Sequence, residues 1–368
     1  MQKRQKGILL LEDGTQFRGQ AATPGTAMGE VVFNTSMTGY QEILTDPSYR
    51  RQIVVMTQPH IGNYGNSANA EESRRPWVEG FIARRFTRRA SGTGKDEELL
   101  AYLERHSMPS LDGLDTRALV RHLRENGAMR GILSSETEDL DALQAKLDTC
   151  PPMTGRALVD EVTFEERFVQ EPIAPWKGEA RCHVALYDFG AKANIARSLA
   201  ERGARVTVLP ARTSAADCLA LGVDGIMLSN GPGDPEPLTE MIETVRTLAD
   251  SGKPLFGICL GHQLLGLALG GRTYKLKFGH HGGNQPVQDT RSGKVQITSQ
   301  NHGFAVDADS LPNGCRISHI NLNDGTVEGI ELEDRPVFSV QYHPEAAPGP
   351  HDAEGLFDRF LKKVVDAS

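Results

Sequence analysis

The chain has 368 residues, 39% hydrophobic and 24% charged, which is ordinary for a globular protein of two or three domains. Its formal net charge of −8 argues against nucleic-acid binding, which normally needs a basic excess. Five scattered cysteines without a Cys-x-x-Cys pair argue against a disulfide framework or a structural zinc site and suit a reducing cytoplasm, and no apolar run is long enough for a signal peptide or a membrane span.

Residues 1–150 are predicted to form a mixed α/β domain that is rich in strands at first and helical later. Two short apolar runs flank Glu12-Asp13-Gly14 and indicate a β-hairpin. Leucines recur at helical spacing in the second half. Strands are expected over 8–11, 16–17, 30–33, 52–56, 78–83 and 129–133, and helices over 96–105, 115–125 and 139–147. The polar stretch 34–49 is expected to be an ordered loop with a helical turn.

Prolines at 151, 152, 172 and 175, with charges between them, predict a linker over 151–181. A second domain is expected over 182–368, because short apolar strands alternate with helices. That alternation predicts an α/β fold with a mostly parallel, twisted sheet and helices on both faces. The expected strands are 183–189, 205–209, 225–228, 255–258, 272–276, 295–298, 316–320, 327–332 and 337–340, and the helices are 192–202, 214–221, 239–249, an apolar helix ending at Gly270, and 353–365. Two histidine-containing segments, 278–284 and 299–304, are interpreted as loops.

A cysteine lies in a short motif between a predicted strand and a helix, Gly257-Ile-Cys-Leu-Gly261. Bulky neighbours would clash in so tight a turn, so glycine is needed on both flanks. Cys259 would project over the N-terminus of the helix, where the dipole and the free N–H groups favour a thiolate. A lone cysteine after an apolar run is more often a small buried residue. The flanking glycines and a candidate base downstream favour a nucleophile here.

The candidate base follows the last predicted strand, in His343-Pro-Glu345. A nucleophilic thiol needs a base to take its proton, and the imidazole needs a carboxylate to fix its tautomer. Cys259, His343 and Glu345 could supply these roles in that order. His302 is the rival candidate for the base, and order along the chain does not decide between the two histidines. The carboxylate two residues after His343 favours His343.

The loop Asn230-Gly-Pro-Gly-Asp234 also follows a predicted strand, one βα unit before Cys259. Ligands of parallel sheets gather at the carboxyl ends of strands, so this loop and Cys259 are expected to converge. The backbone N–H groups of the loop and of Leu260 could then hold an oxyanion. Segment 299–304 ends in Phe304 and suits the rim of an amino-acid pocket. No metal site is expected, because the histidines of 278–284 have no third ligand at suitable spacing.

As a set, residues 230–235, 257–263 and 343–345 resemble the motifs of the class I (triad) glutamine amidotransferases. Other stretches resemble the family of the small, glutamine-hydrolysing subunit of carbamoyl phosphate synthetase. These stretches are 33–49, 59–63, 188–192, 277–284 and 300–304. The resemblance covers nearly the whole chain, including the N-terminal domain, and is thinnest around 85–110 and 150–180.

The resemblance implies that Cys259 attacks the side-chain amide of glutamine, giving a γ-glutamyl thioester and ammonia. His343 would deprotonate the thiol and protonate the leaving amine, and Glu345 would orient His343. The backbone N–H groups of Gly231 and Leu260 would hold the oxyanion. The residues expected to bind L-glutamine are Ser48, Gly231, Gly233, Leu260, Gln263, Asn301, Gly303 and Phe304.

A partner protein is expected on two grounds. Carbamoyl phosphate synthesis needs ATP and bicarbonate, yet the chain has no recognisable phosphate-binding loop, so ammonia made here must be used elsewhere. The resemblance implies a large synthetase subunit that uses ATP, Mg and bicarbonate, receives ammonia through an internal tunnel and contacts the N-terminal domain. It also implies pyrimidine and arginine synthesis as the pathways, and a heterodimer or a higher oligomer of heterodimers. No cofactor is expected in this chain.

Three other functions fit parts of the sequence. One is a triad amidotransferase subunit of a tryptophan- or folate-pathway synthase, although such subunits usually lack a domain like residues 1–150. Another is a free-standing hydrolase of γ-glutamyl bonds, which would work at full rate without a partner. The third is an inactive subunit that only activates its partner, and the presence of Cys259, His343 and Glu345 argues against it.

Overall fold

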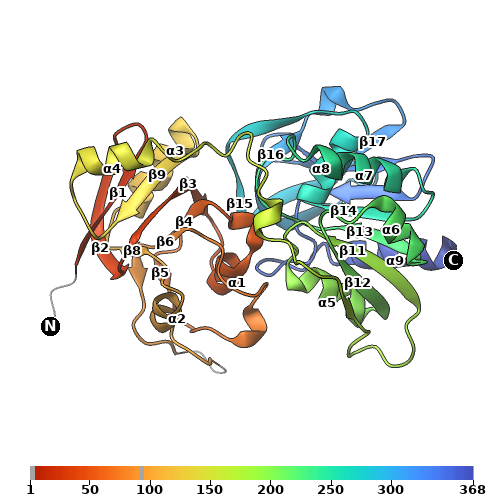
Figure 1. Cartoon of the computed structure of the whole chain (residues 1–368), viewed down its shortest axis with the longest axis horizontal. Helices are drawn as coiled ribbons and strands as arrows, with labels where there is room; N and C mark the ends of the chain where they lie inside the picture. Colours follow the sequence, from red (N-terminus) through yellow and green to blue (C-terminus); the bar gives the residue numbers. More distant parts are fainter. Residues whose placement is uncertain (1–4, 92–94, 368) are drawn as a thin grey trace. The chain divides into compact units, whose positions relative to one another are not determined.

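The computed structural model describes residues 5–91 and 95–367 and divides the chain into two compact units (Figure 1). The N-terminal unit comprises Met1–Met153 and Lys277–Gly282, and the C-terminal unit comprises Thr154–Leu276 and Gly283–Ser368. Each unit has its own hydrophobic core. Among the described residues, no helix is both long enough and apolar enough to cross a membrane.

The N-terminal unit is built on a closed β-barrel. Its strands are β1 (Lys6–Leu11), β2 (Gln16–Thr23), β3 (Thr26–Asn34), β4 (Gln52–Met56), β6 (Gly80–Ile82), β8 (Ser110–Asp112) and β9 (Met129–Ser134). They pair in the order β1-β2-β8-β6-β4-β3-β9, and β9 closes the barrel by pairing antiparallel with β1. Closure leaves the barrel strands without a free edge.

The helices of this unit pack on the barrel, and two very short strands pair beside it. The helices are α1 (Tyr40–Thr45), α2 (Leu99–Arg105), α3 (Thr116–Asn126) and α4 (Leu140–Leu147), with 3-10 turns η1 (Pro47–Tyr49) and η2 (Ala68–Ala70). The short strands are β5 (His60–Ile61) and β7 (Arg85–Phe86).

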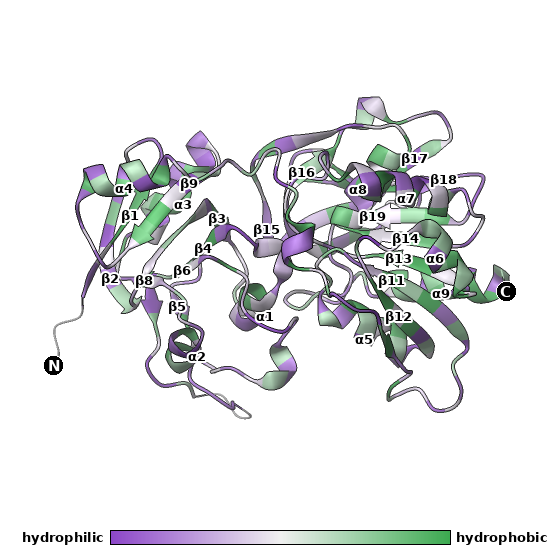
Figure 2. Ribbon diagram, viewed as in Figure 1, coloured by the Kyte–Doolittle hydropathy of each residue, from purple (hydrophilic) through white to green (hydrophobic). Residues whose placement is uncertain are grey.

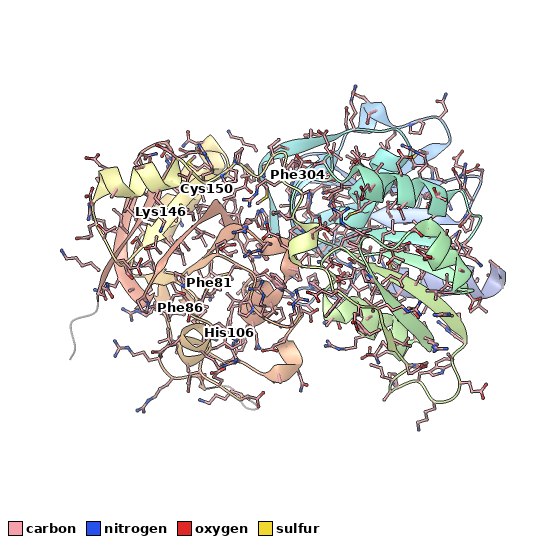
Figure 3. All side chains as sticks on the ribbon, viewed as in Figure 1. Phe81, Phe86, His106, Lys146, Cys150 and Phe304 are labelled. Atoms are coloured by element: carbon pink, nitrogen blue, oxygen red, sulfur yellow. The ribbon has the colours of Figure 1, made fainter. Side chains whose placement is uncertain are left out.

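Strand β4 is buried on both faces, and its alternating side chains join two different hydrophobic clusters. Ile53 belongs to the cluster that contains Leu119 of α3. The next residue, Val54, belongs to a second cluster that contains Phe81 and Phe86, whose ring centroids are 5.7 Å apart (Figure 3). A strand covered on both faces explains why residues 52–56 form an unbroken, mostly apolar run rather than an alternating one.

The sequence predicted most elements of this unit but not the barrel. The hairpin at Glu12-Asp13-Gly14 is confirmed by the pairing of Leu10 with Gln16. Helices α3 and α4 begin directly after Asp115 and Asp139, whose carboxylates accept hydrogen bonds from the first turn. Strand β8 was not predicted, because three residues are too few to show a periodicity.

The C-terminal unit is an α/β domain with one large sheet. Its strands are β10 (Phe168–Gln170), β11 (Cys182–Asp188), β12 (Ala204–Pro210), β13 (Gly225–Leu228), β14 (Leu255–Ile258), β15 (Thr273–Asp289), β16 (Val295–Val306), β17 (Cys315–Asn321), β18 (Val327–Leu332) and β19 (Val337–Val340). The order is β10-β12-β11-β13-β14-β19-β18-β17-β15-β16. The strands β12-β11-β13-β14-β19 are parallel, whereas β10, β17 and β18 pair antiparallel with their neighbours.

Helices cover both faces of this sheet, as predicted. The helices are α5 (Ala193–Glu201), α6 (Ala215–Ala220), α7 (Thr239–Ala249), α8 (Leu260–Ala268) and α9 (Gly355–Ala367), with 3-10 turns η3 (Val159–Glu161) and η4 (Ala308–Ser310). Side chains of α6, α7 and α8 share one cluster with the sheet, and side chains of α5 and α9 share the other. The central strands are accordingly coloured toward the hydrophobic end in Figure 2, since both of their faces are buried.

The stretch predicted as a linker, 151–181, is folded over most of its length. The C-terminal unit begins at Thr154, η3 and β10 lie within the stretch, and β10 pairs antiparallel with β12. Val159 is fully buried in the cluster that contains α6, α7 and α8. Prolines and charges suggested a linker because they are typical of exposed connections, but here they flank short segments that pack on the domain.

The two segments predicted as loops, 278–284 and 299–304, are instead parts of the long strands β15 and β16. Glycine, histidine and asparagine are typical of loops, so composition alone gave the wrong assignment. In β16 the buried polar side chains bond to one another, and His302 Nε2 lies 3.0 Å from Gln300 Oε1. Residues 277–282 of β15 are counted with the N-terminal unit, and the C-terminal unit begins at Thr154 rather than at the predicted 182.

Candidate active site

Cys259 occupies a strained turn between β14 and α8. Its backbone has φ 54° and ψ −102°, in a region that residues with side chains rarely adopt. The Cys259 N–H donates to the carbonyl of Val340 at 2.9 Å, and the Cys259 carbonyl accepts from the N–H of Gln263 at 3.1 Å. A single strained residue between a buried strand and a helix is the geometry of a nucleophile elbow, as predicted from the sequence.

Contacts explain both glycines of the elbow. A Cβ atom on Gly257 would lie 2.8 Å from the carbonyl oxygen of Gly261, and one on Gly261 would lie 2.5 Å from that of Leu228. Real Cβ atoms essentially never come so close to backbone. The Gly261 N–H donates to Ser229 at 3.0 Å, so the first turn of α8 is fixed against the end of β13.

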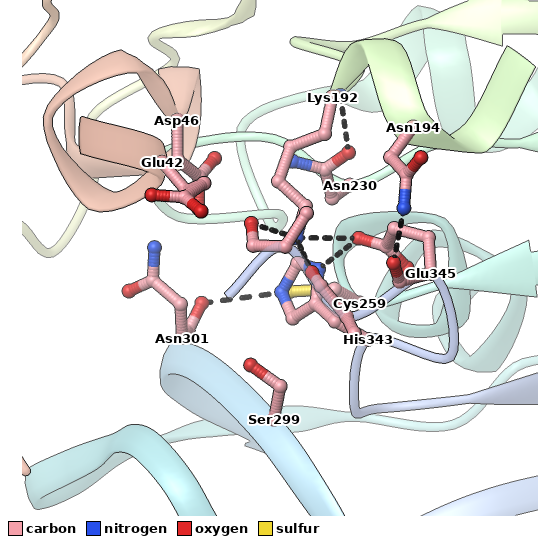
Figure 4. A network of polar contacts seen from close by, with 12 residues as sticks. Glu42, Asp46, Lys192, Asn194, Asn230, Cys259, Ser299, Asn301, His343 and Glu345 are labelled. Carbon is pink, nitrogen blue, oxygen red and sulfur yellow. Dashed lines mark hydrogen bonds and ion pairs between the residues drawn. The ribbon is translucent and has the colours of Figure 1, made fainter. Parts of the chain in front are cut away.

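His343 reaches the same edge of the sheet from the neighbouring strand. β14 and β19 pair in parallel with Ile258 opposite Val340, so Cys259 and His343 both follow the carboxyl ends of adjacent strands. The His343 N–H donates to the carbonyl of Ser299 at 2.8 Å, which fixes its backbone against β16. The His343 side chain is buried, and Figure 4 includes it in one polar network with Cys259.

The two ring nitrogens of His343 have different surroundings. Nδ1 lies 2.6 Å from Glu345 Oε1, a charge-assisted hydrogen bond between two buried groups. Nε2 is buried and has no hydrogen-bond partner among the described residues. Because the carboxylate holds the proton on Nδ1, Nε2 is the nitrogen able to accept a proton from a thiol.

His302, the rival candidate for the base, has both ring nitrogens engaged within β16. Nδ1 lies 2.8 Å from the carbonyl oxygen of Phe304, and Nε2 lies 3.0 Å from Gln300 Oε1. Both of these partners are uncharged oxygen atoms, one of a backbone carbonyl and one of a side-chain amide. The surroundings of the two histidines therefore favour His343 as the base and give His302 a role in holding β16.

Lys192 completes the surroundings of Glu345, and sequence reasoning gave it no role. Its side chain is 2% exposed, and Nζ lies 2.9 Å from Glu345 Oε1. Nζ also donates to the carbonyls of Ala346 and Ala347, two residues with positive φ that follow Glu345 directly. Two signals in the sequence pointed to Lys192. It lies just beyond the carboxyl end of β11, where ligands and functional groups gather, and it ends the stretch 188–192 that resembles the small-subunit family.

The protonation of Glu345 follows from these neighbours. Burial by itself raises the pKa of Glu345, but the charge of Lys192, the charge of His343 and hydrogen bonds from both outweigh it and bring the pKa to about 2. Glu345 is therefore ionised at neutral pH although it is fully buried. An ionised carboxylate is the form that can orient His343 and stabilise an imidazolium.

We expect Lys192→Met to destabilise the chain by about 3–5 kcal/mol, because it leaves a buried carboxylate without its cation. In wild type, the Lys192–Glu345 pair stabilises the fold at pH values above about 4.3, the ordinary pKa of a glutamate. This stabilisation is lost as the pH falls toward about 2, the pKa of Glu345 in the folded chain. The variant should thus lose less unfolding free energy than wild type when the pH is lowered from 6 to 3. Urea denaturation followed by circular dichroism at both pH values measures the difference.

The matched control is the double variant Lys192→Met/Glu345→Gln, which removes both charges. It should recover most of the stability lost in Lys192→Met, since a neutral amide tolerates burial better than an unpaired carboxylate. Equal stability of wild type and Lys192→Met at pH 7 would show that the ion pair does not stabilise the fold.

Gly231 and Leu260, the residues that carry the candidate oxyanion donors, lie close together. A Cβ atom on Gly231 would be 2.7 Å from Leu260 Cδ2 and 2.2 Å from the carbonyl oxygen of Phe189, so only glycine fits there. Throughout residues 5–91 and 95–367, no acceptor is recorded for the N–H of Gly231 or of Leu260. Asn230 holds the loop in place because its side-chain oxygen accepts the N–H of Lys192 at 3.1 Å.

Residues 154–158 support the other glycine of this loop. Gly233 has φ +90° and bridges Ala157, and the N–H of Asp234 donates to Arg156 at 3.0 Å. The carboxylate of Asp234 accepts the N–H of Gly155 at 2.8 Å. The start of the stretch predicted as a linker therefore shapes the loop that carries Gly231.

The residues predicted to bind glutamine fall into two groups. Those of the C-terminal unit gather around the elbow: the thiol of Cys259 donates to the carbonyl of Asn301 at 3.6 Å, and Gln263 Nε2 donates to the carbonyl of Phe304 at 2.9 Å. Gly303 lies between these two acceptors in β16. Ser48 belongs to η1 of the N-terminal unit, where its N–H donates to Asp46 at 2.9 Å. Glutamine binding by these residues stays a prediction.

A cysteine on a strand–helix elbow, with an imidazole and a carboxylate just beyond the end of the neighbouring parallel strand, is typical of enzymes with a cysteine nucleophile. Comparison with known proteins agrees with this class. The family described as "Glutamine amidotransferase class-I" matches residues 185–363. The family described as "Carbamoyl-phosphate synthase small chain, CPSase domain" matches residues 9–133.

Several curated proteins are similar over nearly the full length. The carbamoyl phosphate synthase small chain of Syntrophotalea carbinolica is 54% identical over 365 residues, covering 96% of each chain. Those of Neisseria meningitidis and Escherichia coli K12 are 53% and 50% identical, covering 98% and 97% of each chain, respectively. The chain belongs to the carbamoyl phosphate synthase small chain family.

Proposed function

We propose that this chain is the glutaminase subunit of carbamoyl phosphate synthetase and that Cys259, His343 and Glu345 carry out the hydrolysis. Membership of the small chain family supports the subunit role. The observation that carries the catalytic assignment is the buried His343–Glu345 pair at the edge where the Cys259 elbow ends. The open Nε2 of His343 and the paired nitrogens of His302 support the choice of base.

The reaction follows from these groups. His343 Nε2 takes the thiol proton, and the Cys259 sulfur forms a bond to the side-chain carbonyl carbon of L-glutamine. The N–H groups of Gly231 and Leu260 hold the oxyanion that develops. The C–N bond then breaks, and the imidazolium returns its proton to the leaving amine, which departs as ammonia. Water activated by His343 hydrolyses the γ-glutamyl thioester, releasing glutamate and restoring the thiol.

A large synthetase subunit is the proposed consumer of the ammonia. It would use ATP, Mg and bicarbonate to make carbamoyl phosphate for pyrimidine and arginine synthesis, and this chain would need no cofactor of its own. The proposed assembly is a heterodimer or an oligomer of heterodimers. A cytoplasmic location is supported by the five cysteines, which are all free thiols.

The test is ammonia release from L-glutamine by the chain alone, and with a large subunit from the same source in the presence of ATP, Mg and bicarbonate. We expect slow release by the chain alone and a large rise with the partner, accompanied by carbamoyl phosphate. Equal rates with and without the partner would instead indicate a free-standing hydrolase. No release in either condition would leave only the role of an inactive subunit.

A further inference from the structure

Gln341 follows β19 directly, two residues before His343, and its side chain is fully buried. The Gln341 N–H donates to the carbonyl of Glu328 at 2.9 Å, which holds its backbone against β18. Its side-chain Oε1 accepts a hydrogen bond from Nε2 of Gln263 at 3.1 Å. None of the proposed chemical steps uses Gln341, so its amide needs a separate explanation.

The other end of the Gln341 amide shows that packing is not that explanation. Nε2 is buried and has no hydrogen-bond partner within residues 5–91 and 95–367. A buried N–H group without an acceptor has lost its bonds to water and replaced them with none. A methionine of similar volume would avoid this loss. The bond from Gln263 is therefore the contact that a glutamine, and not an apolar side chain, supplies here.

Two acceptors fix the direction of the Gln263 amide. Its Nε2 donates to the carbonyl of Phe304 at 2.9 Å and to Gln341 Oε1 at 3.1 Å. An amide nitrogen has two hydrogens, so these bonds use both donors of the side chain. A reversed amide would set Gln263 Oε1 against the Phe304 carbonyl oxygen, which can only accept. Gln341 supplies the second acceptor and so prevents the amide from rotating.

The Oε1 atom of Gln263 is then left for a ligand beside the thiol. Oε1 has no recorded donor in the described parts of the chain, and it is not fully enclosed. Gln263 lies in α8 four residues after Cys259, which is about 6 Å along the helix axis and on the same face. The side-chain carbonyl carbon of extended L-glutamine is about 5 Å from its α-nitrogen. A substrate with that carbon at the thiol therefore brings its Cα end to Gln263.

The chemistry of Oε1 decides which group on Cα it contacts. The α-ammonium group has only donors, and the α-carboxylate has only acceptors. Because both donors of the Gln263 amide are used, Oε1 can bond to the ammonium group, whereas a carboxylate placed there would meet another oxygen.

We propose that Gln341 is a positioning residue that holds the amide of Gln263 with Oε1 toward the α-ammonium group of L-glutamine. The site thereby selects substrates that have a free α-amino group. The proposal rests on the proposed function for the identity of the substrate. It adds a residue to which no role had been given, and it states which charged group of the substrate is recognised at this point.

The test compares Gln341→Met with wild type, each in complex with the large subunit, by ammonia release from three substrates. These are L-glutamine, 4-carbamoylbutanoate, which lacks the α-amino group, and 4-aminobutanamide, which lacks the α-carboxylate. We expect kcat/KM of the variant to fall about tenfold for L-glutamine and 4-aminobutanamide, through KM, and to stay within about twofold for 4-carbamoylbutanoate.

Other patterns would overturn the proposal. A loss with 4-carbamoylbutanoate but not with 4-aminobutanamide would mean that Gln263 faces the carboxylate. Equal losses with all three substrates would give Gln341 a merely structural role, and no loss with any would give it none. The melting temperature and ammonium-dependent carbamoyl phosphate synthesis verify that the variant is folded and bound to its partner.

The matched control is Gln300→Met, the same substitution at another buried glutamine of the C-terminal unit. The Gln300 side chain bonds to Thr298 and His302 and makes no recorded bond to Gln263 in the described ranges. The control should change kcat/KM by the same factor for all three substrates. The selective pattern expected of Gln341→Met, found in this control, would contradict a specific role for Gln341.

A second variant tests whether Gln341 acts through Gln263. Gln263→Met should show the same selective pattern, and Gln263→Met/Gln341→Met should be no worse than Gln263→Met alone. A further loss of about tenfold in the double variant would show that the two residues act independently. The pattern of Gln263→Met also decides the ammonium contact if Gln341→Met does not fold. Failure of the wild-type complex to release ammonia from L-glutamine would instead refute the proposed function, so the two failures are distinguishable.

Discussion

Replacing Cys259 with alanine should abolish glutamine-dependent carbamoyl phosphate synthesis by the complex, a fall of at least about 10⁴-fold in kcat/KM. The thiol is the group that would form the covalent thioester, and no other described side chain at the elbow can replace it. Synthesis driven by ammonium chloride should continue at the wild-type rate, since that reaction bypasses the thiol. The measurement is carbamoyl phosphate formation with each nitrogen source.

Alanine should be tolerated at this turn, because the strain at φ 54° arises from a Cβ atom that cysteine and alanine share. Cys259→Ser is the matched control for volume and polarity, and it should be as inactive with glutamine as the alanine variant, because a hydroxyl is not ionised by an imidazole at neutral pH as readily as a thiol. Loss of both the glutamine and the ammonia reactions in Cys259→Ala would show that the cysteine is structural.

Replacing His343 with asparagine should lower the glutaminase rate by about 10²–10⁴-fold, the usual contribution of a general base. Asparagine can keep a hydrogen bond to Glu345 but cannot accept the thiol proton. The fall should appear in kcat, because the proton transfer belongs to the chemical step. Steady-state ammonia release in the complex measures it, and ammonium-dependent synthesis checks that the partner is intact.

His302→Asn is the matched comparison, because it makes the same substitution at another buried histidine. His302 lies between Asn301 and Gly303, two of the residues predicted to bind glutamine. His302 bonds to Phe304 and Gln300 within β16, so its loss should loosen that strand and raise KM for glutamine while leaving most of kcat. A larger loss of kcat in His302→Asn than in His343→Asn would mean that the base has been assigned to the wrong histidine.

Local pattern predicted the elements of the C-terminal unit well. The expected strands 225–228, 327–332 and 337–340 and the helix 239–249 have the observed bounds. Such segments are buried on one or both faces, so their hydrophobic pattern reports their surroundings directly. The pattern failed where polar residues are buried in long strands, as in β15 and β16, because composition there resembles a loop.

The sequence by itself determined the elbow, the His343–Glu345 pair and the helices on both faces of the sheet. Each of these depends on residues close together in the chain, on fixed spacing or on the rule that parallel strands end at one edge. Gly257 and Gly261 illustrate this, since a tight turn imposes glycine whatever surrounds it.

Only the tertiary structure decided the features that join distant residues. Lys192 meets Glu345 across 153 positions of sequence, His302 is engaged on both nitrogens, and the closed barrel needs the pairing of β9 with β1. Short-range periodicity contains no information on such pairings, because hydrogen bonds and charges act through space and not along the chain.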